Sequence, residues 1–197
     1  MKFLNWHPII LAAIIFSNAT SYAQGDAPPI KKGTVLTYQV TENGNSYKYV
    51  ASITKFSAQD GIAVEWKDTE QPAKSGSFEM RYKNTEDATA LQVKITEGKE
   101  SFGTEDSRIF ISDAMTKDIS FYHLQDIKVD GTAHSFLFIN TTAEEKEINY
   151  NNKKIKVDYN SGEDKDVYIG IINLENAKLL GIFAYKKYAI ELISVTN

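Results

Sequence analysis

The chain contains no cysteine. A protein without thiols cannot form disulfides, use a thiolate as a nucleophile, or bind zinc through cysteine ligands. It also offers no cysteine for acylation behind a signal peptide, which excludes a lipoprotein anchor. If the protein is exported, its hydrophobic core alone must therefore stabilise it.

Glycine is scarce, with eleven residues, and no two of them stand two or four positions apart. The dinucleotide-binding pattern G-x-G-x-x-G and the hydrolase pattern G-x-S-x-G are therefore both absent. Gly98 and Gly103 have the spacing of a phosphate-binding P-loop, but Thr104 follows them where that motif requires lysine.

Histidine is rarer still, with three residues, and no H-E-x-x-H zinc motif occurs. A hairpin turn at residues 130–131 puts His134 opposite Ile127, where a hydrogen-bonded structural histidine is favoured over a metal ligand. A Ser-His-Asp triad needs no fixed spacing, so the sequence neither excludes nor supports one. We predict a protein that is not an enzyme, with no catalytic residue, metal site or cofactor.

An acidic stretch at residues 158–169 resembles a calcium loop only superficially. Glu163 and Ile169 replace the glycine and the bidentate glutamate that such a loop requires. A polar hairpin connection is the favoured interpretation of this stretch.

No excess of basic charge is present, since 22 lysines and arginines stand against 26 acidic residues and both signs are interspersed. Nucleic-acid binders carry a basic footprint instead. We therefore predict no nucleic-acid partner.

Only one apolar run is conspicuous, and it lies between Ile9 and Phe16, behind the charge of Lys2. It is too short for a membrane-spanning helix and is followed by small polar residues ending at Ala23, which is typical of a cleaved signal peptide. We predict a signal peptide over residues 1–23 and an exported mature protein, periplasmic or extracellular, without a membrane span.

The mature part has the length of one domain. Pro28 and Pro29 predict an extended tail over residues 24–33, and residues 34–197 then form a single β-rich domain. No linker-like segment or internal repeat divides that domain.

Alternating apolar and polar residues dominate this domain. The pattern is clearest around Asn43-Gly44, which predicts a two-residue hairpin turn. That turn pairs three sets of apolar residues across two strands, namely Val40 with Tyr47, Tyr38 with Tyr49, and Leu36 with Ala51. Further alternating runs at residues 62–66, 78–82 and 91–95 predict strands with one buried and one exposed face.

Turn signals separate these runs every 10 to 20 residues. A turn at residues 151–152 puts Ile148 opposite Ile155 and Glu147 opposite Lys156. Helix is limited to a short piece capped by Ser112 and another within residues 141–149. The predicted fold class is mainly β, a single strongly curved antiparallel sheet (half-barrel or open barrel) of about ten to twelve strands with one or two short helices.

Three segments carry a family resemblance: KKGTVLTYQV at residues 31–40, DSRIFISDAM at 106–115 and AKLLGIFAYKKYAIELISV at 177–195. They resemble a group of uncharacterised secreted bacterial proteins, similar in style to the periplasmic half-barrels related to the lipoprotein carrier LolA. The resemblance implies a curved antiparallel sheet with an apolar concave face, and it carries no catalytic residues.

The last predicted hairpin is apolar on both faces, over residues 167–172 and 179–185. A four-residue loop at 174–177 puts Gly170 opposite Gly181, and two facing glycines permit a sharp bend or a close approach by another group. We predict a crease there, with the ligand-binding residues Tyr168, Gly170, Ile172, Leu179, Gly181 and Phe183 on the concave face.

A sheet with two apolar faces must cover both of them. If a lipid or acyl chain covers the second face, the protein is an exported binding or carrier module for an apolar ligand. If another protein covers that face, the chain is a non-catalytic envelope protein that acts through this partner. An extracytoplasmic hydrolase is a third, less favoured hypothesis. A short helix or the N-terminal segment is an equally simple cover.

Overall fold

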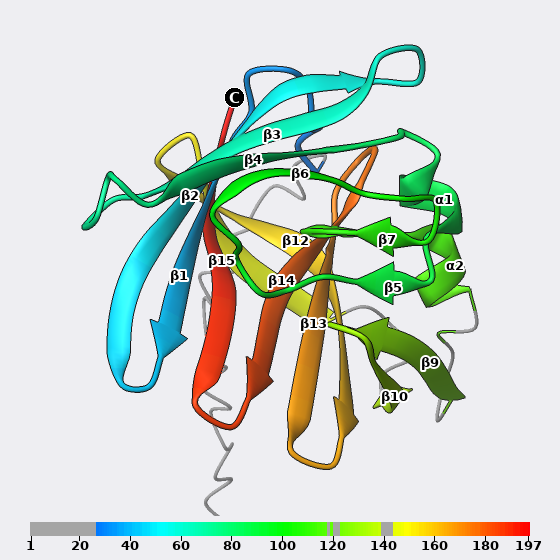
Figure 1. Ribbon diagram of the computed structural model, residues 1–197. Coiled ribbons are helices and arrows are strands. Elements are labelled where there is room, and N and C mark those ends of the chain that lie inside the picture. Colours follow the sequence, from blue (N-terminus) through cyan, green and yellow to red (C-terminus); the bar gives the residue numbers. More distant parts are fainter. Residues whose placement is uncertain (1–26, 118, 120–122, 139–143) are drawn as a thin grey trace, which may run out of the picture.

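The computed structural model describes residues 27–117, 119, 123–138 and 144–197 (Figure 1). The predicted signal peptide lies outside these residues. In the described part, fifteen strands form one strongly curved sheet, accompanied by two short helices. The predicted fold class is therefore confirmed. No helix of this part is long and apolar enough to cross a membrane.

The first four strands form an antiparallel meander: β1 (Val35–Glu42), β2 (Asn45–Ser57), β3 (Gly61–Asp68) and β4 (Ser75–Met80). Asn43 and Gly44 both have positive φ angles, 52° and 85°, as a hairpin turn with matching twist requires. The predicted register is confirmed, since Tyr38 pairs with Tyr49 and Leu36 pairs with Ala51.

The C-terminal half supplies seven longer strands: β9 (His123–Val129), β10 (Thr132–Phe138), β11 (Glu144–Tyr150), β12 (Lys153–Asp164), β13 (Val167–Asn173), β14 (Lys178–Tyr185) and β15 (Tyr188–Thr196). The last strand, β15, pairs antiparallel with β1, so the two ends of the domain meet in the middle of the sheet. In Figure 1, β3 and β4 run across the picture whereas β13 to β15 run down it, which displays the curvature.

A ring of five strands closes within this sheet. β11 pairs antiparallel with β12 and parallel with β15, at Tyr150 and Val195, so that β11 to β15 form a small barrel-like closure. The helix predicted within residues 141–149 is therefore wrong over residues 144–149, which belong to β11. Pairing on both sides overrides the helical propensity of its glutamates and lysine.

The turn at residues 151–152 has the predicted register, with Ile148 opposite Ile155. Glu147 lies opposite Lys156 as predicted, but the ion pairs of this hairpin join diagonal neighbours. Lys154 contacts Glu147 at 2.5 Å, and Lys156 contacts Glu145 at 2.5 Å. These long side chains reach the diagonal neighbour because a strand pair brings both within range.

Residues 84–117, called the cover from here on, contain the remaining short elements: α1 (Asn84–Asp87), β5 (Ala90–Leu91), β6 (Gly98–Ser101), β7 (Asp106–Ser107), β8 (Phe110–Ile111) and α2 (Asp113–Thr116). Ser112 caps α2 as predicted, since its hydroxyl accepts from the Met115 amide at 3.0 Å. The strand predicted over 91–95 is wrong beyond Leu91, because β5 pairs parallel with β7 and β9 over only two residues.

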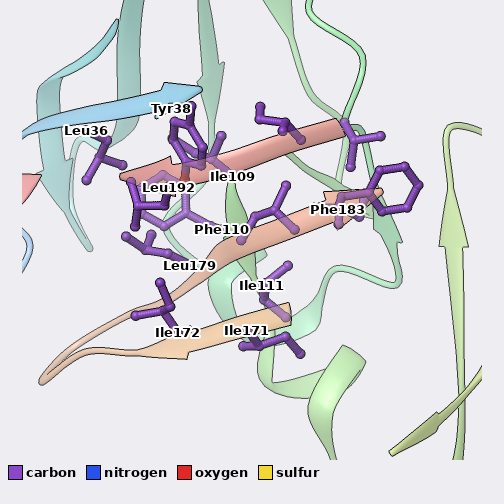
Figure 2. Packing of buried hydrophobic residues seen from close by; sticks show 14 of the residues in the cluster. Leu36, Tyr38, Ile109, Phe110, Ile111, Ile171, Ile172, Leu179, Phe183 and Leu192 are labelled. Carbon is purple, nitrogen blue, oxygen red and sulfur yellow. The ribbon is translucent and has the colours of Figure 1, made fainter. Parts of the chain in front are cut away.

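The core lies between the concave face of the sheet and the cover. Alternate residues of β1 to β4 are buried there, and the cover contributes Ile109, Phe110 and Ile111, each at most 2% exposed. Figure 2 shows these three side chains among buried residues of β1, β14 and β15, including Tyr38, Leu192 and Phe183. The concave face is thus filled by the chain's own apolar side chains.

Candidate functional site

The predicted crease is a β-bulge, one position out of the expected register. Ile171 pairs with Leu180 as predicted, but Gly170 then pairs with Ile182, which leaves Gly181 without an opposite residue. The expectation that the two glycines face each other is therefore wrong. A Cβ at Gly181 would stand 3.2 Å from the Gly170 carbonyl oxygen, so the bulge brings the two backbones close together.

The extra residue also changes which side chains share a face. Side chains alternate along a strand, so Tyr168, Ile172 and Leu179 lie on one face, whereas Phe183 pairs with Ile169 and turns to the other. The predicted common face is wrong for Phe183. As ligand-binding residues, the six positions remain a prediction.

An aromatic ring of the protein occupies the space beside Gly170. A Cβ at Gly170 would overlap the Tyr159 hydroxyl oxygen, and that hydroxyl lies 2.9 Å from the Tyr168 hydroxyl. The Lys146 ammonium lies 5.1 Å from the centre of the Tyr159 ring. Burial and the neighbouring Tyr168 raise the pKa of Tyr159. Gly170 therefore provides room for a packed tyrosine.

Replacing Gly170 by alanine is expected to lower the free energy of unfolding by about 1–3 kcal/mol, because the new methyl overpacks the site against Tyr159 and Ile182. Urea denaturation measures the change. Gly103→Ala is the matched control, since its Cβ meets no atom within 4 Å and is expected to be nearly neutral. Equal stability of both variants would contradict a packed site at Gly170.

A surface hollow of about 560 Å³ lies where β3, β4 and the cover meet. Its lining mixes both charges: Lys55, Arg81, Lys83, Asp60 and Glu79. Cations therefore outnumber carboxylates at its rim, which favours the approach of an anion.

Phe102 forms part of the inner wall of this hollow and is half-buried. Its ring centre lies 5.6 Å from that of Phe78. Behind it, the guanidinium carbon of Arg108 lies 5.1 Å from the Phe102 centre and 5.8 Å from the Phe78 centre. Phe102 thus lines the hollow and packs against a buried arginine.

Arg108 forms an ion pair with Glu100 inside the molecule. Its Nη1 donates to Glu100 Oε2, and its Nη2 donates to Oε1 at 3.4 Å. The Arg108 side chain is only 5% exposed, whereas that of Glu100 is 25% exposed. The Arg108 Nε–H is buried and has no partner among the described residues.

Three further buried polar atoms have no partner in the described part of the chain: the hydroxyls of Tyr38 and Tyr49 and the indole Nε1 of Trp66. The ring centres of Tyr38 and Tyr49 lie 5.9 Å apart, and those of Tyr49 and Trp66 lie 5.4 Å apart. Native structures rarely leave buried polar atoms unpaired, so such atoms mark a position that needs an explanation.

The pKa values of both tyrosines reflect this environment. Burial raises the pKa of Tyr38, with a further rise from Tyr49. Burial also raises the pKa of Tyr49, while the Arg108 guanidinium lowers it and the Glu100 carboxylate raises it. The two charges of the ion pair therefore act on the pKa of Tyr49 in opposite directions.

The backbone next to Arg108 is strained. Ile109 has a φ of 56°, in the left-handed region that a β-branched residue rarely adopts. The Phe110 amide donates to the Arg108 carbonyl at 2.7 Å, which closes a γ-turn, and the Leu180 amide donates to the Ile109 carbonyl at 2.7 Å. The hydrogen bond to β14 holds this unfavourable turn in place.

The other residues with possible site chemistry lie elsewhere. His134 pairs with Ile127 across the β9–β10 hairpin, as predicted, and its Nδ1 lies 3.0 Å from Asp164 Oδ2. Residues 158–169 form the end of β12, a turn and the start of β13, so the predicted hairpin connection is confirmed. Within the described residues, no group of three or more histidines and carboxylates is arranged to hold a metal.

Sequence reasoning identified Tyr38 and Tyr49 as an inward-facing pair, but it missed Arg108, Glu100 and Phe102. The available signal is Arg108 itself, which stands directly before the apolar run Ile109–Ile111. A charge beside a buried run needs a buried partner, but nothing local indicates that the partner is Glu100.

The sequence matches no protein-family model, and comparison with curated proteins and with solved structures gives no match either. The resemblance to LolA-related half-barrels therefore stays a prediction.

Proposed function

We propose that this chain is an exported, non-catalytic binding or carrier protein for an apolar or amphiphilic molecule of the cell envelope, such as a lipid or acyl chain. The ligand lies along the concave face, in the space that Ile109–Ile111, called the plug from here on, fill in the structure. The observation that carries the proposal is the strained turn that seats the plug.

The plug bridges the two halves of the curved sheet. Phe110 and Ile111 pair with β14, while the Phe110 ring stacks on Phe56 of β2 with centres 5.9 Å apart. A left-handed backbone at a non-glycine residue costs about 1–3 kcal/mol and clusters at ligand clamps and switch regions. An apolar ligand that replaces the plug releases this strain and keeps the concave face covered.

The parts of the cover are tied to one another by side-chain hydrogen bonds. Asn84 Nδ2 donates to the carbonyls of Gly103 and Asp106, at 2.6 and 2.7 Å, which ties α1 to the loop around β7. The Ser112 hydroxyl likewise donates to the Ala88 carbonyl. The cover joins the longer strands through short pairings: β6 with β4 over four residues, and β5 with β9 and β8 with β14 over two residues each. In the proposed mode of binding, the pairing of β8 opens when the ligand replaces the plug.

Native mass spectrometry of protein purified from membrane-containing cells tests the proposal, with the same sample delipidated and refolded as control. We expect an adduct with the mass of a lipid or fatty acid before delipidation only. Hexadecanoic acid at about 100 times its Kd is expected to stabilise the delipidated protein by about 2.7 kcal/mol, which raises the Tm by about 5–10 °C.

Absence of any adduct, together with a Tm unchanged by hexadecanoic acid and by phosphatidylglycerol vesicles, would exclude the carrier function. The remaining hypothesis would then be a protein partner in the envelope.

A further inference from the structure

We infer that the bound molecule carries an anionic headgroup, a carboxylate or a phosphate, and that this anion takes the place of Glu100 on Arg108. The inference rests on the proposed function, because it names the headgroup of the molecule whose chain lies on the concave face. It follows from the hydrogen-bonding chemistry of the four buried atoms without partners.

All four atoms can donate a hydrogen bond, and two of them can do nothing else. The Arg108 Nε–H and the Trp66 Nε1–H are donors only, whereas the hydroxyls of Tyr38 and Tyr49 both donate and accept. A concave face with surplus donors lacks acceptors. Carboxylates and phosphates are the headgroups richest in acceptors, and they match the fork of an arginine.

Arg108 is held ready for such an anion. Its guanidinium is fixed against the rings of Phe78 and Phe102, so its orientation does not depend on Glu100 alone. Tyr49 and Tyr38 are buried in the same core, with ring centres 5.9 Å apart, and their hydroxyls add two further donors without partners in the described residues.

The Glu100 carboxylate can leave Arg108 without leaving the buried arginine unpaired, provided that an anion takes its place. It lies on β6, the outermost strand of the sheet, which pairs only with β4 over four residues. Its side chain is 25% exposed, so a small rotation returns the carboxylate to water. One carboxylate then replaces another on Arg108, and the buried charge stays balanced.

The hollow beside Phe102 supplies the route. Lys55, Arg81 and Lys83 line its rim and attract an anion, although Lys83 also contacts Asp87 at 2.7 Å. Phe102 is half-buried, lines this hollow and packs against Arg108. In the inferred complex the headgroup reaches Arg108 past Phe102.

Isothermal titration calorimetry of the delipidated protein tests the inference with four probes of one chain length: hexadecanoic acid, hexadecyl phosphate, methyl hexadecanoate and 1-hexadecanol. We expect the acid or the phosphate to bind at least about tenfold more tightly than the two neutral probes. Which anion binds better separates a free fatty acid from a phospholipid headgroup.

Two variants assign the preference to Arg108. Glu100→Gln removes the internal competitor and is expected to tighten anion binding about tenfold, with 1-hexadecanol unchanged. Arg108→Lys loses the bidentate fork and is expected to weaken anion binding about tenfold. Lys83→Gln is the control at the rim, and we expect a weaker effect that disappears at high salt.

The outcomes are distinct. Equal binding of all four probes to the wild type would overturn the anionic headgroup and leave the proposed function standing, and this result needs no variant to fold. A preference for anions that neither Arg108→Lys nor Glu100→Gln alters would overturn the assignment to Arg108. Failure of every probe to bind would contradict the proposed function itself.

Discussion

Replacing Phe110 by alanine is expected to lower the free energy of unfolding by about 3–5 kcal/mol, as the loss of a large buried aromatic side chain usually does. Phe110 is 0% exposed and stacks on Phe56 across the concave face. The variant leaves a cavity lined by both halves of the sheet. Urea denaturation, followed by circular dichroism, measures the change.

The same variant tests whether the plug takes the place of a ligand. If an acyl chain binds where Phe110 lies, the cavity of Phe110→Ala is already open to it and part of the competing side chain is gone. Hexadecanoic acid is then expected to raise the Tm of the variant by more degrees than that of the wild type, because a ligand that binds only the folded state stabilises it.

Phe136→Ala is the matched control. Phe136 is also 0% exposed, but it lies in the β9–β10 hairpin, where its ring centre is 5.6 Å from His134. We expect a similar loss of stability and no extra response to hexadecanoic acid. An equal response of both variants would show general binding to destabilised protein and would contradict a ligand site at the plug.

The sequence predicted most reliably what neighbouring residues decide. Asn43-Gly44 determines a turn type, and the turn determines the pairing of Tyr38 with Tyr49, so the first hairpin has its predicted register. Ser112 likewise marks the start of α2, because its own hydroxyl caps the helix.

What the sequence could not predict depends on side chains of neighbouring elements. A side chain at Gly181 would meet Ile172 of β13, which no local pattern of β14 contains. The strand β11 pairs with β12 across the predicted turn, but its second partner, β15, lies more than 40 residues away. The pairing of Arg108 with Glu100 depends on the course of the whole cover, so the candidate site was visible only in part.

Replacing both Tyr38 and Tyr49 by phenylalanine is expected to raise the free energy of unfolding, by about 1–3 kcal/mol for each hydroxyl removed. A buried hydroxyl without a partner gives up its hydrogen bonds to water and gains none in return. The two rings are neighbours, so the gains need not be additive. The variant is also expected to bind hexadecanoic acid more weakly, since it lacks two donors.

Tyr159→Phe provides the opposite case. Its hydroxyl lies 2.9 Å from that of Tyr168, so its removal breaks a hydrogen bond and is expected to cost about 0.5–1.5 kcal/mol. A loss of stability in Tyr38→Phe/Tyr49→Phe, like that in Tyr159→Phe, would show that both buried hydroxyls are satisfied within the folded protein.

The pH dependence gives an independent measure of the same burial. Folding raises the pKa of Tyr38 and Tyr49, so ionisation of these groups costs no stability below the pKa of the unfolded chain, about 10. Above that pH the unfolded chain loses these protons first, and each tyrosine is expected to lower the stability by about 1.4 kcal/mol per pH unit. The double variant lacks both contributions. The difference in free energy of unfolding between this variant and the wild type is therefore expected to be constant between pH 7 and 9 and to grow between pH 10 and 11. Parallel stability curves up to pH 11 would contradict the burial of the two hydroxyls, and with it the reserve of donors on which the anionic headgroup depends.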